Sequence, residues 1–248
     1  MNATTASRSH NSVPLRATRK RITIKKSVVP GVPELVNGDA LDANEFMRRY
    51  EASPDIRKAE LIDGIVYIMS SPVSISHHGE PDILMHTLLC MYGIETPGVR
   101  ASAEATVRLG TKNVPQPDAS LRYLPERKGN SRISSDDYLE GSPELIVEIS
   151  ASSASIDTHK KFDAYQSAGV REYIIVLTKV PEVKWWYLDD RTYQPLPPDE
   201  DGILRSRVFP GLWLDPKALL KGDGKRVLAV LRKGLKSKEH AAFAKLVS

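Results

Sequence analysis

Apolar and polar residues recur along the first hundred positions at two different periods, which predict helices and strands. Residues 42–50 begin with acidic and end with basic side chains, as a capped helix does. Residues 60–69 form two short apolar runs around Asp63-Gly64, a pair typical of a two-residue hairpin turn. Residues 78–91 place apolar side chains at helical spacing. A helix, a β-hairpin and a second helix are therefore expected in this order.

The following segments are read mainly as strands. The 125–141 stretch is polar and contains glycine, which indicates a mobile loop, whereas 143–150 is almost continuously apolar, as a central strand is. Strands are expected at 103–109, 118–124, 143–150, 172–177 and 183–188, and helices at 155–169, 215–221, 223–234 and 237–246. This order predicts an α/β fold of the α+β-like kind, with a mixed central β-sheet flanked by helices.

Charge divides the 248-residue chain into an arm and a body. The formal net charge is +4, but residues 1–30 carry seven basic and no acidic side chains, which leaves −3 for the rest. We expect a disordered basic arm over 1–35, a folded domain over 36–221 and a C-terminal helical extension over 222–248. A flexible cationic arm attracts polyanions such as nucleic acids, or it serves as a solubilising tail; the sequence leaves both open.

Composition excludes several classes of protein. Cys90 is the single cysteine, so the chain has neither an internal disulfide framework nor a zinc site built from several cysteines. No stretch approaches the roughly 20 apolar residues of a membrane span, and the basic N-terminus lacks the apolar core of a secretory signal. A cytoplasmic protein without a membrane partner is expected.

Two carboxylates carry the candidate chemistry. Asp118 follows Pro117 at the start of one predicted strand, and Glu148 lies two residues inside the end of another. A buried carboxylate is costly unless a metal ion, a cation or hydrogen bonds compensate it. Taken alone, Asp118 is better explained as an aspartate that caps a turn. The alternative reading of Glu148 is half of a buried ion pair. Together they favour a site for a hard divalent cation, and we expect one of the two to have a raised pKa.

Lys161 adds a positive charge on the following helix. Its alternative reading is a pair with Asp157, four residues earlier on the same face. Lys160 competes for the site, but the two lysines point about 100° apart on a helix. Because Lys161 lies four residues before the apolar Tyr165, Lys161 is expected to face the sheet.

These features form an ordered set of motifs. Glu60-Leu-Ile-Asp-Gly, Met69-Ser-Ser-Pro with His77-His78, Pro117-Asp118, Pro143-Glu-Leu-Ile-Val-Glu148, Lys161-Phe-Asp-Ala-Tyr165 and Phe209-Pro-Gly-Leu-Trp-Leu follow one another. Over residues 40–220 this set resembles the Uma-type restriction endonuclease family, a branch of the PD-(D/E)XK nuclease superfamily. The resemblance implies a restriction-endonuclease-like core and an endonuclease that hydrolyses phosphodiester bonds of DNA with Mg²⁺ or Mn²⁺. A homodimer is also expected.

The resemblance also implies roles for individual residues. Asp118, Glu148 and the backbone carbonyl of Ile149 would hold the metal, and Asp118, Glu148 and Lys161 would be catalytic. The superfamily keeps its lysine where this chain has Ser150, so the lysine role passes to Lys161.

Accessory residues and other functions stay open. Glu60 is either a second metal ligand or a strand charge, and His77 and His78 either line the cleft or cap a helix. The alternative function is a catalytically degenerate module of the same fold, which binds nucleic acid or acts as a structural or regulatory dimer.

Overall fold

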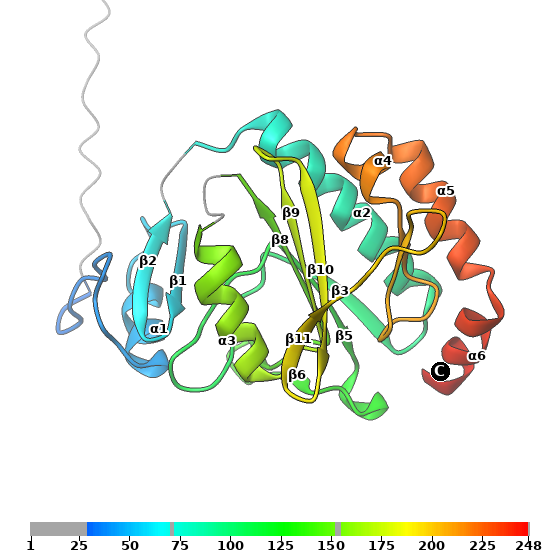
Figure 1. Cartoon of the computed structure of the whole chain (residues 1–248). Coiled ribbons are helices and arrows are strands. Elements are labelled where there is room, and N and C mark those ends of the chain that lie inside the picture. Colours follow the sequence, from blue (N-terminus) through cyan, green and yellow to red (C-terminus); the bar gives the residue numbers. More distant parts are fainter. Residues whose placement is uncertain (1–28, 70–71, 152–154, 248) are drawn as a thin grey trace, which may run out of the picture.

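The computed structural model describes residues 29–69, 72–151 and 155–247 (Figure 1). Most of the predicted basic arm, residues 1–28, lies outside this range. The helices are α1 (Ala43–Glu51), α2 (Glu80–Glu95), α3 (Lys161–Ala168), α4 (Pro216–Leu220), α5 (Gly224–Leu235) and α6 (Lys238–Val247). The strands are β1 (Lys58–Ile62), β2 (Ile65–Met69), β3 (Val99–Ala103), β4 (Val107–Arg108), β5 (Ala119–Tyr123), β6 (Ser131–Ile133), β7 (Leu139–Gly141), β8 (Leu145–Ser150), β9 (Glu172–Leu177), β10 (Glu182–Asp189), β11 (Thr192–Pro195), β12 (Leu204–Arg205) and β13 (Trp213–Leu214).

A six-stranded mixed sheet forms the centre, in the order β11-β10-β9-β8-β5-β3. The β8–β9 pair is parallel, and the neighbouring pairs are antiparallel. Residues of α2 and α5 pack with Val147 on one face of the sheet, while Tyr165 of α3 packs with Ile146 on the other (Figure 1). The prediction of a mixed sheet flanked by helices, with 143–150 as a central strand, is therefore confirmed.

Local sequence signals explain the element boundaries. The Asp42 side chain accepts a hydrogen bond from the Glu45 N–H and caps α1. Asp63 and Gly64 both adopt positive φ (51° and 75°), as the two-residue turn between β1 and β2 requires. Gly169 ends α3 in the left-handed conformation. The predicted helices and the predicted hairpin are confirmed in these places.

Two predictions about the middle of the chain are wrong in part. The continuous strand expected at 103–109 is not formed: β3 lies earlier, at Val99–Ala103, and within the expected range only the two-residue β4 follows it. Glu104 adopts a positive φ of 47°, which separates the two strands. The loop expected at 125–141 contains β6 and β7, which join β4 in a separate three-stranded sheet. Strands of two or three residues are too short to show an alternation of apolar and polar positions, so the sequence pattern gives no signal for them.

The C-terminal helices belong to the main core. Val227 and Leu231 of α5 are buried in the same cluster as Met85 and Leu88 of α2. Leu35, at the end of the predicted arm, is also buried, against Phe46 of α1. In the part of the chain that is described, no helix has the length and apolar character to cross a bilayer.

Glu172, the first residue of β9, is a buried carboxylic acid that makes the stability of the fold depend on pH. Glu172 accepts hydrogen bonds from the Ser206 hydroxyl and from the N–H groups of Arg207 and Val208. Burial nevertheless raises its pKa from 4.5 to about 7. Between these values the folded protein keeps a proton that the unfolded chain has released, so the free energy of unfolding falls as pH rises.

The expected fall is roughly 2–3 kcal/mol between pH 4.5 and pH 7, at about 1.4 kcal/mol per pKa unit. Urea unfolding of the wild type and of Glu172→Gln, measured across this range, tests it. The Gln variant cannot titrate, so its stability should change less with pH by this amount. Identical pH profiles for the two proteins would show that Glu172 is already ionised throughout.

Candidate active site

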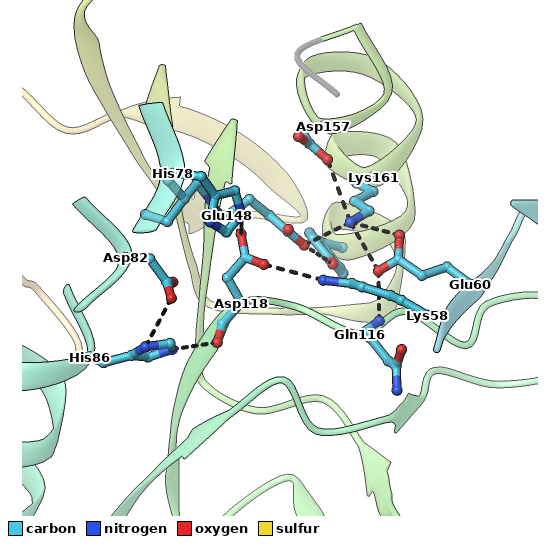
Figure 2. A network of polar contacts seen from close by, with 12 residues as sticks. Lys58, Glu60, His78, Asp82, His86, Gln116, Asp118, Glu148, Asp157 and Lys161 are labelled. Atoms are coloured by element: carbon cyan, nitrogen blue, oxygen red, sulfur yellow. Dashed lines mark hydrogen bonds and ion pairs between the residues drawn. The ribbon is translucent and has the colours of Figure 1, made fainter. Parts of the chain in front are cut away.

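Asp118 and Glu148 come from neighbouring strands and lie in one buried cluster (Figure 2). Asp118 directly precedes β5, and Glu148 lies in β8; the two strands pair with Ala119 opposite Val147. Asp118 is 4% exposed and Glu148 is 3% exposed. The structure thus brings the two sequence-predicted carboxylates together at one edge of the central sheet.

The Asp118 carboxylate is held from two sides. Its Oδ2 accepts a hydrogen bond of 2.7 Å from the Ile149 N–H, and its Oδ1 accepts one of 3.2 Å from Lys58 Nζ. A residue in a strand directs its N–H and its C=O to the same side. The Ile149 carbonyl therefore points toward the edge at which Asp118 lies, as a shared metal site would need.

Lys161 is buried among carboxylates. Its Nζ lies 2.9 Å from Glu60 Oε2, 3.1 Å from Glu148 Oε1 and 3.5 Å from Asp157 Oδ1, and its side chain is 2% exposed. Burial opposes the charged form, but these three carboxylates outweigh it and raise the lysine pKa well above its usual value. Lys161 therefore makes the predicted pair with Asp157 as well as the predicted contact with the sheet.

The choice between the two neighbouring lysines follows the predicted helix phase. Lys160 is exposed, and its Nζ donates a hydrogen bond of 2.6 Å to the Tyr67 hydroxyl. Lys161 instead points toward Glu148 of the central sheet (Figure 2). Tyr165 also contacts Glu148, so both side chains lie on this side of α3. The expectation that only Lys161 reaches the Glu148 side chain is confirmed.

Burial controls the charge state of Glu148. Desolvation raises its pKa well above 4.5, the nearby ammonium of Lys161 lowers it, and the negative charges of Asp118, Asp157 and Glu60 raise it again. The Tyr165 hydroxyl donates a 2.7 Å hydrogen bond to Glu148 Oε1, and burial followed by this negative charge raises the tyrosine pKa as well. One acid with a raised pKa was expected, and Glu148 is that acid.

Glu60 also joins the cluster, from β1. Its Oε1 accepts hydrogen bonds from Lys161 Nζ (3.0 Å) and from the Gln116 N–H (2.7 Å), and the residue is fully buried. Because side chains alternate along a strand, Lys58, two residues earlier, lies on the same face. Sequence reasoning missed Lys58, although this spacing from Glu60 was available as a signal.

Lys58 differs from Lys161 in its exposure. Its side chain is 24% exposed, and its ammonium group donates a hydrogen bond to Asp118. Burial opposes its charge, but attraction to Asp118, Glu148 and Glu60 is stronger in total and raises its pKa. Lys58 is therefore a cation at the edge of the carboxylate cluster with a path to solvent.

Histidines approach Asp118 from the beginning of α2. His78 Nε2 lies 3.8 Å from Asp118 Oδ2, whereas His77 is exposed and its backbone carbonyl accepts a hydrogen bond from the Thr178 hydroxyl. His86 was not predicted: its Nε2 is 2.7 Å from the Asp118 carbonyl oxygen. A hydrogen bond to Asp82 is the main cause that raises the His86 pKa to about 9. Of the two predicted histidines, only His78 reaches the carboxylates.

The cluster contains more negative than positive charge. Four carboxylates, those of Glu60, Asp118, Glu148 and Asp157, are at most 4% exposed, and two ammonium groups face them. With every group ionised the balance is −2, which one divalent cation would neutralise. Within the described ranges no group of three or more His, Cys, Asp or Glu side chains has the geometry to hold a metal ion. Mg²⁺ often takes only one or two carboxylates and keeps water on its other positions, so the donor set fits it.

Ser150 occupies the position where the superfamily keeps its lysine. The residue is 1% exposed, and its hydroxyl has no hydrogen-bond partner among the residues that the structure describes. Ser150 lies two residues after Glu148 in β8, on the same face of the strand. This strand therefore supplies no ammonium group to the site, and both lysines reach it from other elements.

Comparisons with known proteins identify a family and a similar fold. A model of the Uma2 family, described as "Putative restriction endonuclease", matches residues 43–217. A solved structure described as a "putative nuclease belonging to DUF820" from Anabaena variabilis is similar in fold, with a TM-score of 0.50 and 15% sequence identity. The similarity covers 66% of this chain and 90% of that one. No curated protein matches the chain.

Proposed function

This chain belongs to the Uma2 family, and on that premise we propose that it is a metal-dependent endonuclease that hydrolyses phosphodiester bonds of DNA. The observation that carries the proposal is the buried excess of carboxylates around Asp118 and Glu148. Such an excess is costly in a protein interior and is relieved by a bound divalent cation. The position of this cluster, where β5 and β8 pair in the central sheet, supports the proposal.

The residues of the cluster divide into metal ligands and groups that fix them. Asp118, Glu148 and the Ile149 carbonyl would hold Mg²⁺ or Mn²⁺, which would polarise a phosphoryl oxygen and lower the pKa of a bound water. The Ile149 N–H fixes Asp118, and the Tyr165 hydroxyl fixes Glu148. Lys161 compensates the buried charge behind Glu148.

Lys58 is better placed than Lys161 to meet the substrate. An ammonium group has three donors, and Lys161 directs its own at three carboxylates while 2% exposed. Lys58 donates one hydrogen bond to Asp118, and its side chain is 24% exposed. We therefore propose that Lys58 contacts the scissile phosphate and that Lys161 is a positioning residue.

Replacing Lys58 with Met is expected to lower the cleavage rate by about 10²-fold, because one charged donor to the transition state is lost. The melting temperature of Lys58→Met should stay close to that of the wild type, since the Lys58 side chain is partly exposed. Initial rates on a labelled duplex, with the melting temperature of each protein, test this. Lys160→Met is the matched control: it also removes a lysine with one side-chain partner, Tyr67, and should cleave normally.

Metal binding tests the proposed function independently of cleavage. A cation that binds only the folded protein raises the free energy of unfolding by about 2.7 kcal/mol at 100 times its Kd. We expect Mg²⁺ or Mn²⁺ to raise the melting temperature of the wild type and not that of Asp118→Asn. A wild type that responds to neither ion would contradict the proposed metal site.

The degenerate module is a second candidate, favoured by Ser150 in the usual lysine position. Such a protein would bind nucleic acid without cleaving it. Lys58→Met would then bind nucleic acid nearly as tightly as the wild type, and neither Mg²⁺ nor Mn²⁺ would lead to cleaved product. The assays above separate this candidate from the enzyme.

A further inference from the structure

The C-terminal helices carry a second concentration of positive charge, apart from the N-terminal arm. Residues 216–248 contain nine basic and two acidic side chains, a balance of +7. With +7 in residues 1–30 and +4 in total, residues 31–215 carry −10. The folded body is therefore strongly acidic except at this end, where all nine cations are exposed.

On α5 the cations form one line. Lys225, Arg226, Arg232, Lys233 and Lys236, called here the α5 stripe, fall within an arc of about 120° at 100° per residue. The opposite face buries Val227, Val230, Leu231 and Gly234 in the core. At 1.5 Å per residue the stripe is roughly 16 Å long, a length along which duplex DNA presents about ten phosphate charges.

The stripe is poorly neutralised by the protein itself. Arg226 pairs with Asp215 (2.9 Å), and across the described ranges the other four cations make no salt bridge. Lys217 and Lys221 on α4 and Lys238 on α6 extend the same exposed basic end of the molecule. Like charges held together on a rigid helix repel one another, and a polyanion would relieve that repulsion.

The stripe begins one helix away from the candidate active site, with α2 between them. Gly224, at the start of α5, packs on Leu84 of α2, so closely that a Cβ there would lie 3.0 Å from Leu84 Cδ2. Two residues further along α2, His86 contacts the Asp118 backbone oxygen. Figure 1 shows α5 beside α2, on the same face of the sheet. A polyanion at Asp118 could therefore continue across the first turns of α2 to Lys225.

We infer that the α5 stripe is a docking surface for the phosphate backbone of a nucleic acid held at the Asp118 site. The inference rests on the proposed function. It adds a second place at which the protein holds the nucleic acid, away from the bond that is cleaved. A membrane surface fits less well, because membrane-lying helices expose their apolar face, and that of α5 is buried in the core. Backbone contacts of this kind fix position and carry no sequence preference.

The test is a triple charge reversal within the stripe, Lys225→Glu, Arg232→Glu and Lys236→Glu, in the full-length protein. Arg226 stays in place because it pairs with Asp215. Binding of a fluorescent 30-base-pair duplex is measured in EDTA, so that no cleavage occurs, at several salt concentrations. We expect affinity at low salt to fall by at least tenfold and the slope of log K against log [salt] to flatten by about 3, near 0.9 per lost contact.

The matched control reverses three exposed cations elsewhere, Lys112, Lys179 and Arg191, and reaches the same net charge. It should lose clearly less affinity and keep most of the salt slope. Equal losses in the two triple variants would show that net charge alone matters and would overturn the inference, as would unchanged binding by the stripe variant. Circular dichroism and a thermal melt establish that both variants are folded.

Cleavage separates this inference from the proposed function. The stripe variant should cleave a saturating short duplex with nearly the wild-type kcat and a raised KM, because no active-site residue has changed. If the wild type cleaves DNA while the stripe variant binds normally, the docking surface is wrong and the nuclease stands. If the wild type binds DNA through the stripe but never cleaves it, the docking surface stands and the nuclease is wrong.

Discussion

Asp118→Asn is expected to lower the rate of DNA cleavage by on the order of 10³-fold or more, because metal-ion stabilisation of the transition state is worth several kcal/mol. Asn keeps the size of the side chain and an oxygen that accepts the hydrogen bond from the Ile149 N–H. It removes the negative charge that faces Lys58 and would bind the metal. The fold should therefore persist while the chemistry is lost, which initial rates and a thermal melt measure together.

Glu148→Gln should behave in the same way, since Gln retains an acceptor for the Tyr165 hydroxyl. Asp163→Asn is the matched control for Asp118→Asn, because it makes the same Asp-to-Asn change at an exposed position on α3. It should cleave at the wild-type rate. Normal cleavage by Asp118→Asn would remove this residue from the site, and equal losses in the control would point to an effect of net charge.

Lys161→Met is expected to destabilise the fold by about 3–5 kcal/mol, the cost of breaking a buried ion pair from one side. Lysine at this position faces three buried carboxylates, and the change leaves Glu60, Glu148 and Asp157 without their shared cation. Urea unfolding of the variant against the wild type measures the loss. The loss is expected to be large because the Lys161 side chain is only 2% exposed.

Two further variants make this result specific. Lys160→Met, one residue away and exposed, should change stability by less than about 0.5 kcal/mol. The double variant Lys161→Met with Glu60→Gln should recover part of the loss, because one unpaired charge is removed. If Lys161→Met unfolds at the same urea concentration as the wild type, the carboxylates around Lys161 are protonated in the folded protein. The cluster would then carry no excess of negative charge.

The main elements of the fold could be read from the sequence where apolar periodicity was long enough. The β8 strand and the α3 helix show such patterns. Asp63-Gly64 marks the turn between β1 and β2, and Gly169 marks the end of α3. The small β4-β7-β6 sheet could not be read, because its strands are two or three residues long. Its pairing depends on contacts between distant segments, which a local pattern does not contain.

Some residues of the site could be predicted from the sequence, and others could not. Glu148 could be found because it interrupts an apolar strand, and Asp118 because it follows a proline at the start of a predicted strand. Lys161 could be found because helix phase turns it toward the sheet. The spacing of Lys58 from Glu60 indicates a shared strand face, but not the contact with Asp118, 60 positions away. His86 could not be assigned for the same reason, since it contacts Asp118 across 32 positions. Helix phase showed which lysine faces the sheet, but not that three carboxylates would surround it.

Cleavage of supercoiled plasmid DNA tests the central claim most directly. The wild type is incubated with Mg²⁺, with Mn²⁺ and with EDTA, beside Asp118→Asn and Asp163→Asn. We predict nicked and linear products from the wild type and from Asp163→Asn in the presence of metal, none in EDTA, and none from Asp118→Asn. Intact plasmid in every wild-type reaction, or equal cleavage by Asp118→Asn, would contradict the assignment of this cluster as the active site of a metal-dependent endonuclease.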